Sequence, residues 1–287
     1  RAEGKPKNAM YAMLLPSISN LTLDYIFIKV FDMGMMGAAW ATSLSYGVCA
    51  TYIIYFFLSG QSILRPKLSN FFINYNTVLQ ITSLGSVTLV RQAMVSLTVL
   101  LVNNILYTIG GESSITVYAI ISRMLMFATF PIFGITQGFL PIAGYNYGAK
   151  NWLRVKNIIN TSILYSSVLA TIVFLLIFFY SDLIPQIFSK DIIVSEQTPM
   201  ALRYVFMALP IIGIQLIGAA YFQAIGKAKP ALLLTLSRQG FFFIPLLFLL
   251  PPYIGIDGVW LSFPIADLLS TLITIYFLNR SIRKELI

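Results

Sequence analysis

The sequence predicts an all-α, polytopic membrane protein with eight transmembrane helices. The 287-residue chain is 58% hydrophobic and only 10% charged, whereas an ordinary soluble domain carries about 25% charged residues. Its apolar residues fall into eight runs, and each is long enough to cross the roughly 30 Å hydrocarbon layer as a helix of about 20 residues. These runs lie near residues 9–31, 36–58, 77–108, 115–145, 156–180, 199–222, 231–250 and 258–278.

The positive charges predict how these helices are oriented. A net charge of +9 could indicate a nucleic-acid partner, but the placement of the basic residues argues against one. With a cytoplasmic N-terminus, thirteen Lys and Arg residues fall on the cytoplasmic side, and only Lys29 and Lys190 fall on the other. This positive-inside bias places both termini in the cytoplasm of a multi-pass protein. We therefore expect the lipid bilayer as a partner and no nucleic acid.

Two absences exclude most enzyme chemistry. The sequence has no histidine and a single cysteine, Cys49, so His/Cys metal sites and histidine-based catalytic triads cannot be built. The stretch GAAYFQAIGKA from Gly218 has the wrong glycine spacing for a phosphate loop, and no Ser or Thr follows Lys227. We therefore expect a protein that is not an enzyme and has no cofactor.

An internal repeat organises the chain. RAEGKPKNAM from Arg1 aligns with QAIGKAKPAL from Gln223, and after a one-residue gap MGMMGAA from Met33 aligns with IGIDGVW from Ile254. Because six predicted spans separate the two starts, both copies enter the membrane in the same direction, as in transporters built from parallel repeats. Two of these six spans belong to the first copy itself, so four spans lie between its end and the start of the second copy. No span precedes the first copy. We therefore expect a fragment of a twelve-span protein that lacks four N-terminal spans.

This repeat sets the predicted domain organisation. Residues 1–58 would form the last two helices of a first bundle, and residues 77–287 would form a second bundle of six helices. Residues 59–76 would link the bundles on the cytoplasmic side. Pro66 and the mixed charge beside two phenylalanines predict an amphipathic segment at the membrane surface.

Polar residues in the first two spans predict an ion site. Asn20 and Asp24 are four residues apart and share one helix face. Thr42 lies on the next span among small residues, which let helices approach closely. Oxygen ligands of this kind suit a small cation such as Na+, and a desolvated aspartate suits a proton. The alternative is that Asp24 only makes hydrogen bonds between helices.

The repeat favours a functional site over simple packing. In the second copy, Phe242, Leu246 and Phe263 stand at the positions of the three polar residues. A backbone that merely needed polar contacts would be expected to keep some of them in both copies. The asymmetry indicates a specialised site in the first bundle.

Other polar residues inside apolar runs are candidates for a substrate cavity. Charges at that depth usually face a bundle interior or a wet cavity. For the arginines and Asp267, pairing between helices explains the pattern at least as well as ligand contact, and Arg203 lies near enough to a helix end to reach water. The cavity candidates are Arg91, Gln92, Met124, Gln137, Gln215 and Arg238.

Five segments of the sequence make the chain resemble the multidrug and toxic compound extrusion (MATE) family, in particular its MepA-like bacterial branch. The resembling segments are RAEGKPKNAM, NLTLDYIFI, FDMGMMGAAWAT, PIFGITQGFLPIAGYNYGAKN and QAIGKAKP. The resemblance implies a twelve-helix, two-bundle MATE-type exporter of which this chain carries helices five to twelve. It also implies a cation site in the first bundle. Asn20, Asp24 and Thr42 would contribute to this site, and an aspartate of helix one would complete it. A second-bundle acidic site found in some members has no matching acid here.

The expected function is therefore cation-coupled antiport, with Na+ or H+ entering at Asp24 and amphipathic, cationic drugs leaving. No metal other than Na+ at Asp24 is expected. The implied protein is a monomer of the bacterial inner membrane that acts on small-molecule drugs. The alternative is a flippase for lipid-linked saccharides or related lipids, a class of similar fold. It would predict a cavity richer in arginine, and Arg91, Arg123 and Arg238 keep this alternative open.

Overall fold

A computed structural model describes residues 3–63 and 74–285, and its regular structure is helical, with no strand in either range. The predicted all-α fold class is confirmed. The chain divides into two compact units, Arg1–Asn74 and Tyr75–Ile287. The central part of the predicted amphipathic linker lies outside the described residues.

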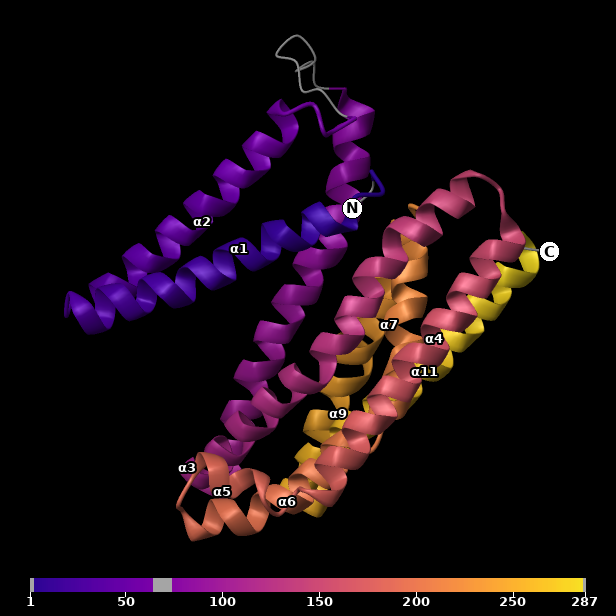
Figure 1. Ribbon diagram of the computed structural model, residues 1–287. Helices are drawn as coiled ribbons and strands as arrows, with labels where there is room; N and C mark the ends of the chain where they lie inside the picture. Colours follow the sequence, from indigo (N-terminus) through magenta and orange to yellow (C-terminus); the bar gives the residue numbers. More distant parts are fainter. Residues whose placement is uncertain (1–2, 64–73, 286–287) are drawn as a thin grey trace. The chain divides into compact units, whose positions relative to one another are not determined.

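The first unit is a helical hairpin. Helix α1 (Pro6–Asp24) continues into a π-helical segment, η1 (Tyr25–Val30), and α2 (Gly34–Leu58) returns beside it (Figure 1). The turn between them is tight, because Asp32 and Gly34 both adopt the left-handed region, with φ of 51° and 54°. This hairpin corresponds to the first two predicted spans.

The second unit opens with the longest helical segment, α3 (Tyr75–Gly148). The backbone leaves the helical conformation at Gly111, where φ is 68° and ψ is −160°, a combination that is open to glycine and costly for other residues. Figure 1 shows the chain descending and rising again as the two limbs of α3. The limbs correspond to the predicted spans 77–108 and 115–145.

The rest of the second unit packs against these limbs. Figure 1 shows α4, α7 and α11 running alongside the rising limb of α3. The remaining elements are α4 (Trp152–Phe179), α5 (Ile184–Phe188), α6 (Ile192–Phe206), α7 (Leu209–Ala224), α8 (Ala228–Leu236), the π-helical η3 (Ser237–Phe243), α9 (Ile244–Leu249), α10 (Pro251–Ile254) and α11 (Ile256–Glu285).

Six of the described helical stretches are long and apolar enough to cross a membrane, and α6 with α7 forms a seventh if the bent pair is one span. Because α3 is two limbs, each of the eight predicted runs has a helical counterpart. The run predicted at 199–222 is not straight, since α6 and α7 meet at 46°. Pro210, in the first turn of α7, has no N–H for the carbonyl of Phe206, so the helical hydrogen bond that would cross this bend is missing.

Two apolar cores fill the second unit. The first includes Ile121, Phe206, Leu247 and Trp260, and the second includes Ile159, Tyr221, Leu234 and Leu278. On α7, buried Gln215 stands between Ile212 of the first core and Ile217 of the second. Helices α4 and α11 and the rising limb of α3 likewise carry buried polar residues between residues of the two cores. We call the buried polar residues between the cores the polar layer: Thr136, Ser166, Gln215, Ser237, Asp267 and Ser270.

Candidate functional site

A stripe of small residues on α2 brings the two helices of the first unit together. Gly37, Ala41 and Ser45 recur every four residues and are the buried residues of α2. Cys49 continues the stripe and donates its thiol to the backbone oxygen of Ala12, 3.2 Å away on α1. Side chains this small let helix backbones approach closely. The stripe therefore fixes which face of α2 meets α1.

The three predicted ion-site residues lie at this contact. The Asn20 amide donates to Thr42 Oγ1 at 3.4 Å, and Thr42 Oγ1 donates to the backbone oxygen of Ala38 at 2.9 Å. Asp24 is one helical turn beyond Asn20 on the same face. Its Oδ1 atom is buried and has no hydrogen-bond partner among the described residues. Buried carboxylate oxygens are normally paired, so this atom lacks a donor or a cation.

A break in helical geometry follows Asp24 directly. Tyr25–Val30 is π-helical, and the Phe31 N–H bonds to the Ile26 carbonyl, five residues earlier, at 3.0 Å. π-Helical turns of this kind are rare and frequently mark functional sites. Close packing accompanies the break, because an added Cβ at Gly37 would lie 3.0 Å from Phe27 Cβ. No feature of the sequence predicted this π-helical segment.

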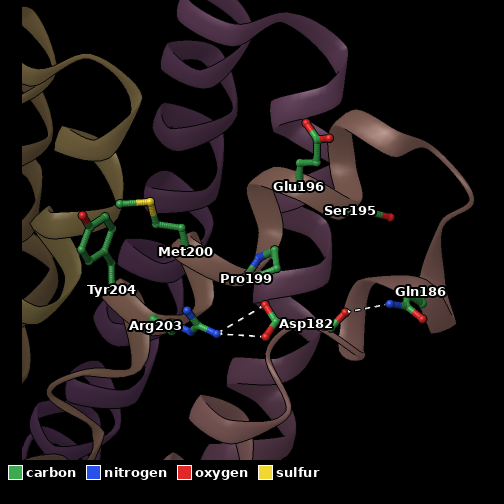
Figure 2. Close-up of a pocket in the computed structure, with 8 residues that line it drawn as sticks. All are labelled: Asp182, Gln186, Ser195, Glu196, Pro199, Met200, Arg203 and Tyr204. Atoms are coloured by element: carbon green, nitrogen blue, oxygen red, sulfur yellow. Dashed lines mark hydrogen bonds and ion pairs between the residues drawn. The ribbon is translucent and has the colours of Figure 1, made fainter.

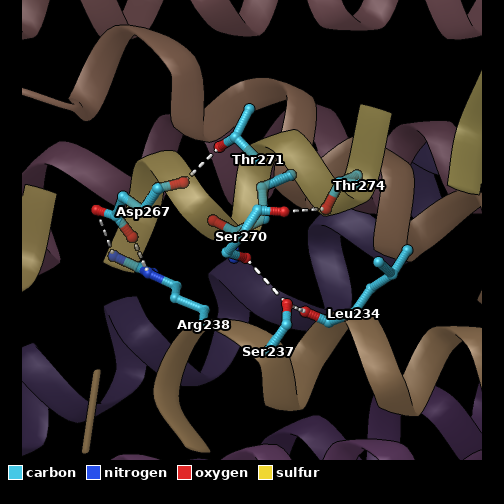
Figure 3. A network of polar contacts seen from close by, with 8 residues as sticks. Leu234, Ser237, Arg238, Asp267, Ser270, Thr271 and Thr274 are labelled. Carbon is cyan, nitrogen blue, oxygen red and sulfur yellow. Dashed lines mark hydrogen bonds and ion pairs between the residues drawn. The ribbon is translucent and has the colours of Figure 1, made fainter. Parts of the chain in front are cut away.

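One cavity candidate, Gln215, belongs to the polar layer of the second unit, and another, Arg238, contacts it. Gln215 is buried, and its Nε2 donates to Ser270 Oγ, whereas its Oε1 has no partner among the described residues. Arg238, on η3, forms an ion pair with Asp267 of α11 (Figure 3). The pairing between helices that was one of the two interpretations is thus what the structure contains for Arg238 and Asp267.

The other four candidates are dispersed over α3. Arg91 is exposed and its guanidinium lies 5.9 Å from the centre of the Phe133 ring. Gln92 and Gln137 are also exposed, and Met124 packs against the first apolar core. The described second unit therefore does not gather these residues into a single cavity.

Two cavities of the second unit have other linings. One of about 620 Å3 is lined by α5, α6 and the turn before them (Figure 2). There Arg203 donates to Asp182 Oδ2 at 3.0 Å, at the end of its helix as expected for an arginine that reaches water. The other, of about 370 Å3, lies between α3 and the α9 and α10 helices and includes Asn104 and Phe248.

Sequence reasoning missed the hydroxyl groups of the polar layer. Ser237 and Ser270 lie 3.1 Å apart between η3 and α11 and are fully buried. Their signal was present in the spacing of polar residues on α11, since Asp267, Ser270, Thr271 and Thr274 recur at three and four residues and share one helix face.

Comparisons with known proteins agree on one family. The profile of the MatE family matches residues 86–249. The multidrug export protein MepA of Staphylococcus saprophyticus is 28% identical over 283 residues, covering 97% of this chain and 62% of the relative. MepA of Staphylococcus aureus (strain bovine RF122) is 27% identical over 272 residues, covering 95% and 60%. This chain thus spans about 60% of the length of the curated relatives it matches.

The fold has the same relatives. A solved structure described as the outward-facing conformation of a multidrug resistance MATE family transporter of the MOP superfamily superposes with a TM-score of 0.92 at 24% identity. The superposition covers 98% of this chain and 63% of that one.

Proposed function

Because this chain belongs to the MatE (MATE) family, we propose that it is part of a membrane transporter that exports amphipathic, cationic drugs in exchange for Na+ or H+. The chain would supply most of the coupling-ion site and the whole second bundle. The proposal rests above all on the Oδ1 atom of Asp24, which is buried and has no partner among the described residues, beside the contact between Asn20 and Thr42.

The oxygen atoms at this site suit either coupling ion. A carboxylate, an amide oxygen and a hydroxyl are hard oxygen ligands of the kind that bind Na+, and the same carboxylate can accept a proton. Ion binding must favour one conformation of the transporter, since a ligand with equal affinity for two states shifts neither. The α1–η1–α2 hairpin is the element on which such a preference would act.

Drug export is inferred from the relatives, which are named multidrug export proteins. Flexible methionines and aromatic rings along the rising limb of α3, with Pro131 and Pro141, suit a surface that adapts to different apolar ligands. We further propose that the protein is a monomer in the bacterial inner membrane, with both ends of this chain in the cytoplasm.

Replacement of Asp24 tests the coupling role. In the full-length protein, Asp24→Asn is expected to abolish efflux of a fluorescent cationic dye driven by an imposed Na+ or pH gradient. The neutral amide has no negative charge with which to bind Na+ or a proton. Efflux from reconstituted vesicles under each gradient separately measures this loss and identifies the ion.

The matched control for this test is Asp32→Asn. Asp32 is exposed in the turn after η1, and asparagine tolerates its left-handed conformation. It should transport normally. Full efflux by Asp24→Asn would reject the assignment of this site.

The flippase alternative predicts a different substrate. It relied on a cavity rich in arginine, but the charge of Arg238 is neutralised by Asp267. Arg91 and Arg123 are exposed and keep the alternative testable. Vesicles that flip a labelled lipid-linked saccharide but do not export the dye would replace the drug-export proposal.

A further inference from the structure

An ion pair lies deep inside the second unit. Arg238 Nε donates to Asp267 Oδ1, and Arg238 Nη2 donates to Oδ2 at 3.3 Å, so both carboxylate oxygens are engaged (Figure 3). Asp267 is only 2% exposed. The Arg238 side chain is 25% exposed, so part of it is accessible from outside the core.

Both partners lie far from the helix ends. Arg238 comes ten residues after Ala228, where its helical stretch begins, and Asp267 comes eleven residues after Ile256, where α11 begins. At about 1.5 Å per residue, each lies roughly 15 Å along its helix, beyond the distance over which a side chain can reach the membrane surface. A charge at this depth is costly unless it is paired.

The surroundings hold the pair between two kinds of layer. On one side, the Phe243 and Phe263 rings lie 4.5 Å apart, with Tyr118 6.4 Å from Phe263. On the other side lie the hydroxyl groups of Ser237 and Ser270. The aromatic rings form an apolar layer on one side, and on the other the two hydroxyl groups and Gln215 link η3, α7 and α11.

The internal repeat places this pair next to the counterpart of the ion site. Phe263 takes the position of Thr42, so aromatic packing fills the place where the first unit has site oxygens. Arg238 and Asp267 take the positions of Pro16 and Tyr46, which cannot form an ion pair. The second unit has therefore lost the polar site and has an ion pair of its own one helical turn away.

We propose that Arg238 is a permanent counter-cation of Asp267, one that cannot dissociate because it is part of the chain. In the second unit, Arg238 takes the place that an exchangeable ion has in the first unit. The comparison with an exchangeable ion rests on the proposed function. The tethered cation links η3 to α11 whatever the ion gradient, so that ion-dependent change is confined to the first unit. Arg238 and Asp267 are thus positioning residues.

Removal of the tether should convert the pair into a binding site for a free cation. In Arg238→Ala, the carboxylate of Asp267 is left uncompensated beside a cavity of guanidinium shape. We expect the thermal unfolding midpoint of the purified full-length protein to fall by several degrees. Millimolar methylguanidinium should restore it saturably, whereas choline at the same concentration should not.

Three comparisons make this test specific. All variants are made in an Asp24→Asn background, so that a cation response cannot come from the first unit and the result does not depend on transport. Arg238→Ala/Asp267→Ala should not respond to methylguanidinium. Arg203→Ala removes an exposed arginine from a hydrated pair with Asp182 and should not respond either.

The absence of a saturable methylguanidinium response in folded Arg238→Ala would overturn the proposal. If Arg238→Ala does not give monodisperse protein, Arg238→Ala/Asp267→Ala is decisive, because removal of both charges also removes the uncompensated carboxylate. Recovery of folded protein in the double variant supports the tether. A double variant as defective as the single one refutes it.

Discussion

Asp24 and Asp267 both lie well inside membrane-spanning helices of this chain, and they differ in what their carboxylates contact. Asp267 has both oxygens engaged by Arg238. Asp24 has one buried oxygen with no partner among the described residues, and the nearby contact joins two neutral side chains, Asn20 and Thr42. A carboxylate with a fixed counter-charge is structural, whereas one without it can bind an exchangeable ion.

The hydroxyl of Thr42 can be tested independently of the carboxylate. Thr42→Val keeps the shape of the side chain but removes the oxygen that accepts from Asn20. The loss of one ligand should weaken ion binding by about 1–2 kcal/mol, or roughly 5- to 30-fold in the ion concentration for half-maximal efflux. The maximal rate should persist, and an unchanged ion requirement would remove Thr42 from the site.

At the scale of elements, close approach between helices decides where the site residues lie. The stripe on α2 begins at Gly37, where an added Cβ would meet both Cβ and the carbonyl carbon of Phe27 at 3.0 and 3.1 Å. Gly47, on the same helix, is exposed and has open space around it. The two glycines therefore serve different purposes in one helix.

This difference predicts opposite outcomes for the same substitution. Gly37→Leu should separate α2 from η1 and destabilise the protein by about 1–3 kcal/mol, with loss of ion-driven efflux. Gly47→Leu should change stability by no more than about 0.5 kcal/mol, because its side chain points away from α1. Thermal unfolding of the two purified variants provides the comparison, and equal effects would show that the stripe does not determine packing.

At the scale of the whole molecule, the sequence predicted what depends on composition and periodicity. The apolar runs located the membrane helices, and the spacing of Asn20 and Asp24 with Thr42 predicted a contact that the structure contains in part. The bend before α7 was not predicted, because prolines such as Pro16 and Pro264 lie inside continuous helices and Pro210 is not distinguished from them by sequence alone. The π-helical segments and the pairing of Arg238 with both carboxylate oxygens of Asp267 depend on tertiary packing, which cannot be derived from a single sequence.

Orientation in the membrane is the remaining property of the whole molecule that the sequence predicts, and single cysteines can test it. In a cysteine-free background, Lys190→Cys places an exposed thiol on the loop between α5 and α6, and Lys229→Cys places one in the first turn of α8, at the opposite end of the second unit (Figure 1). With the termini in the cytoplasm, a membrane-impermeant maleimide should label Lys190→Cys in intact cells and Lys229→Cys only after permeabilisation, because basic residues concentrate on the cytoplasmic side. Dye efflux of both variants controls for folding, and the reverse labelling pattern would invert the direction of drug and ion movement proposed above.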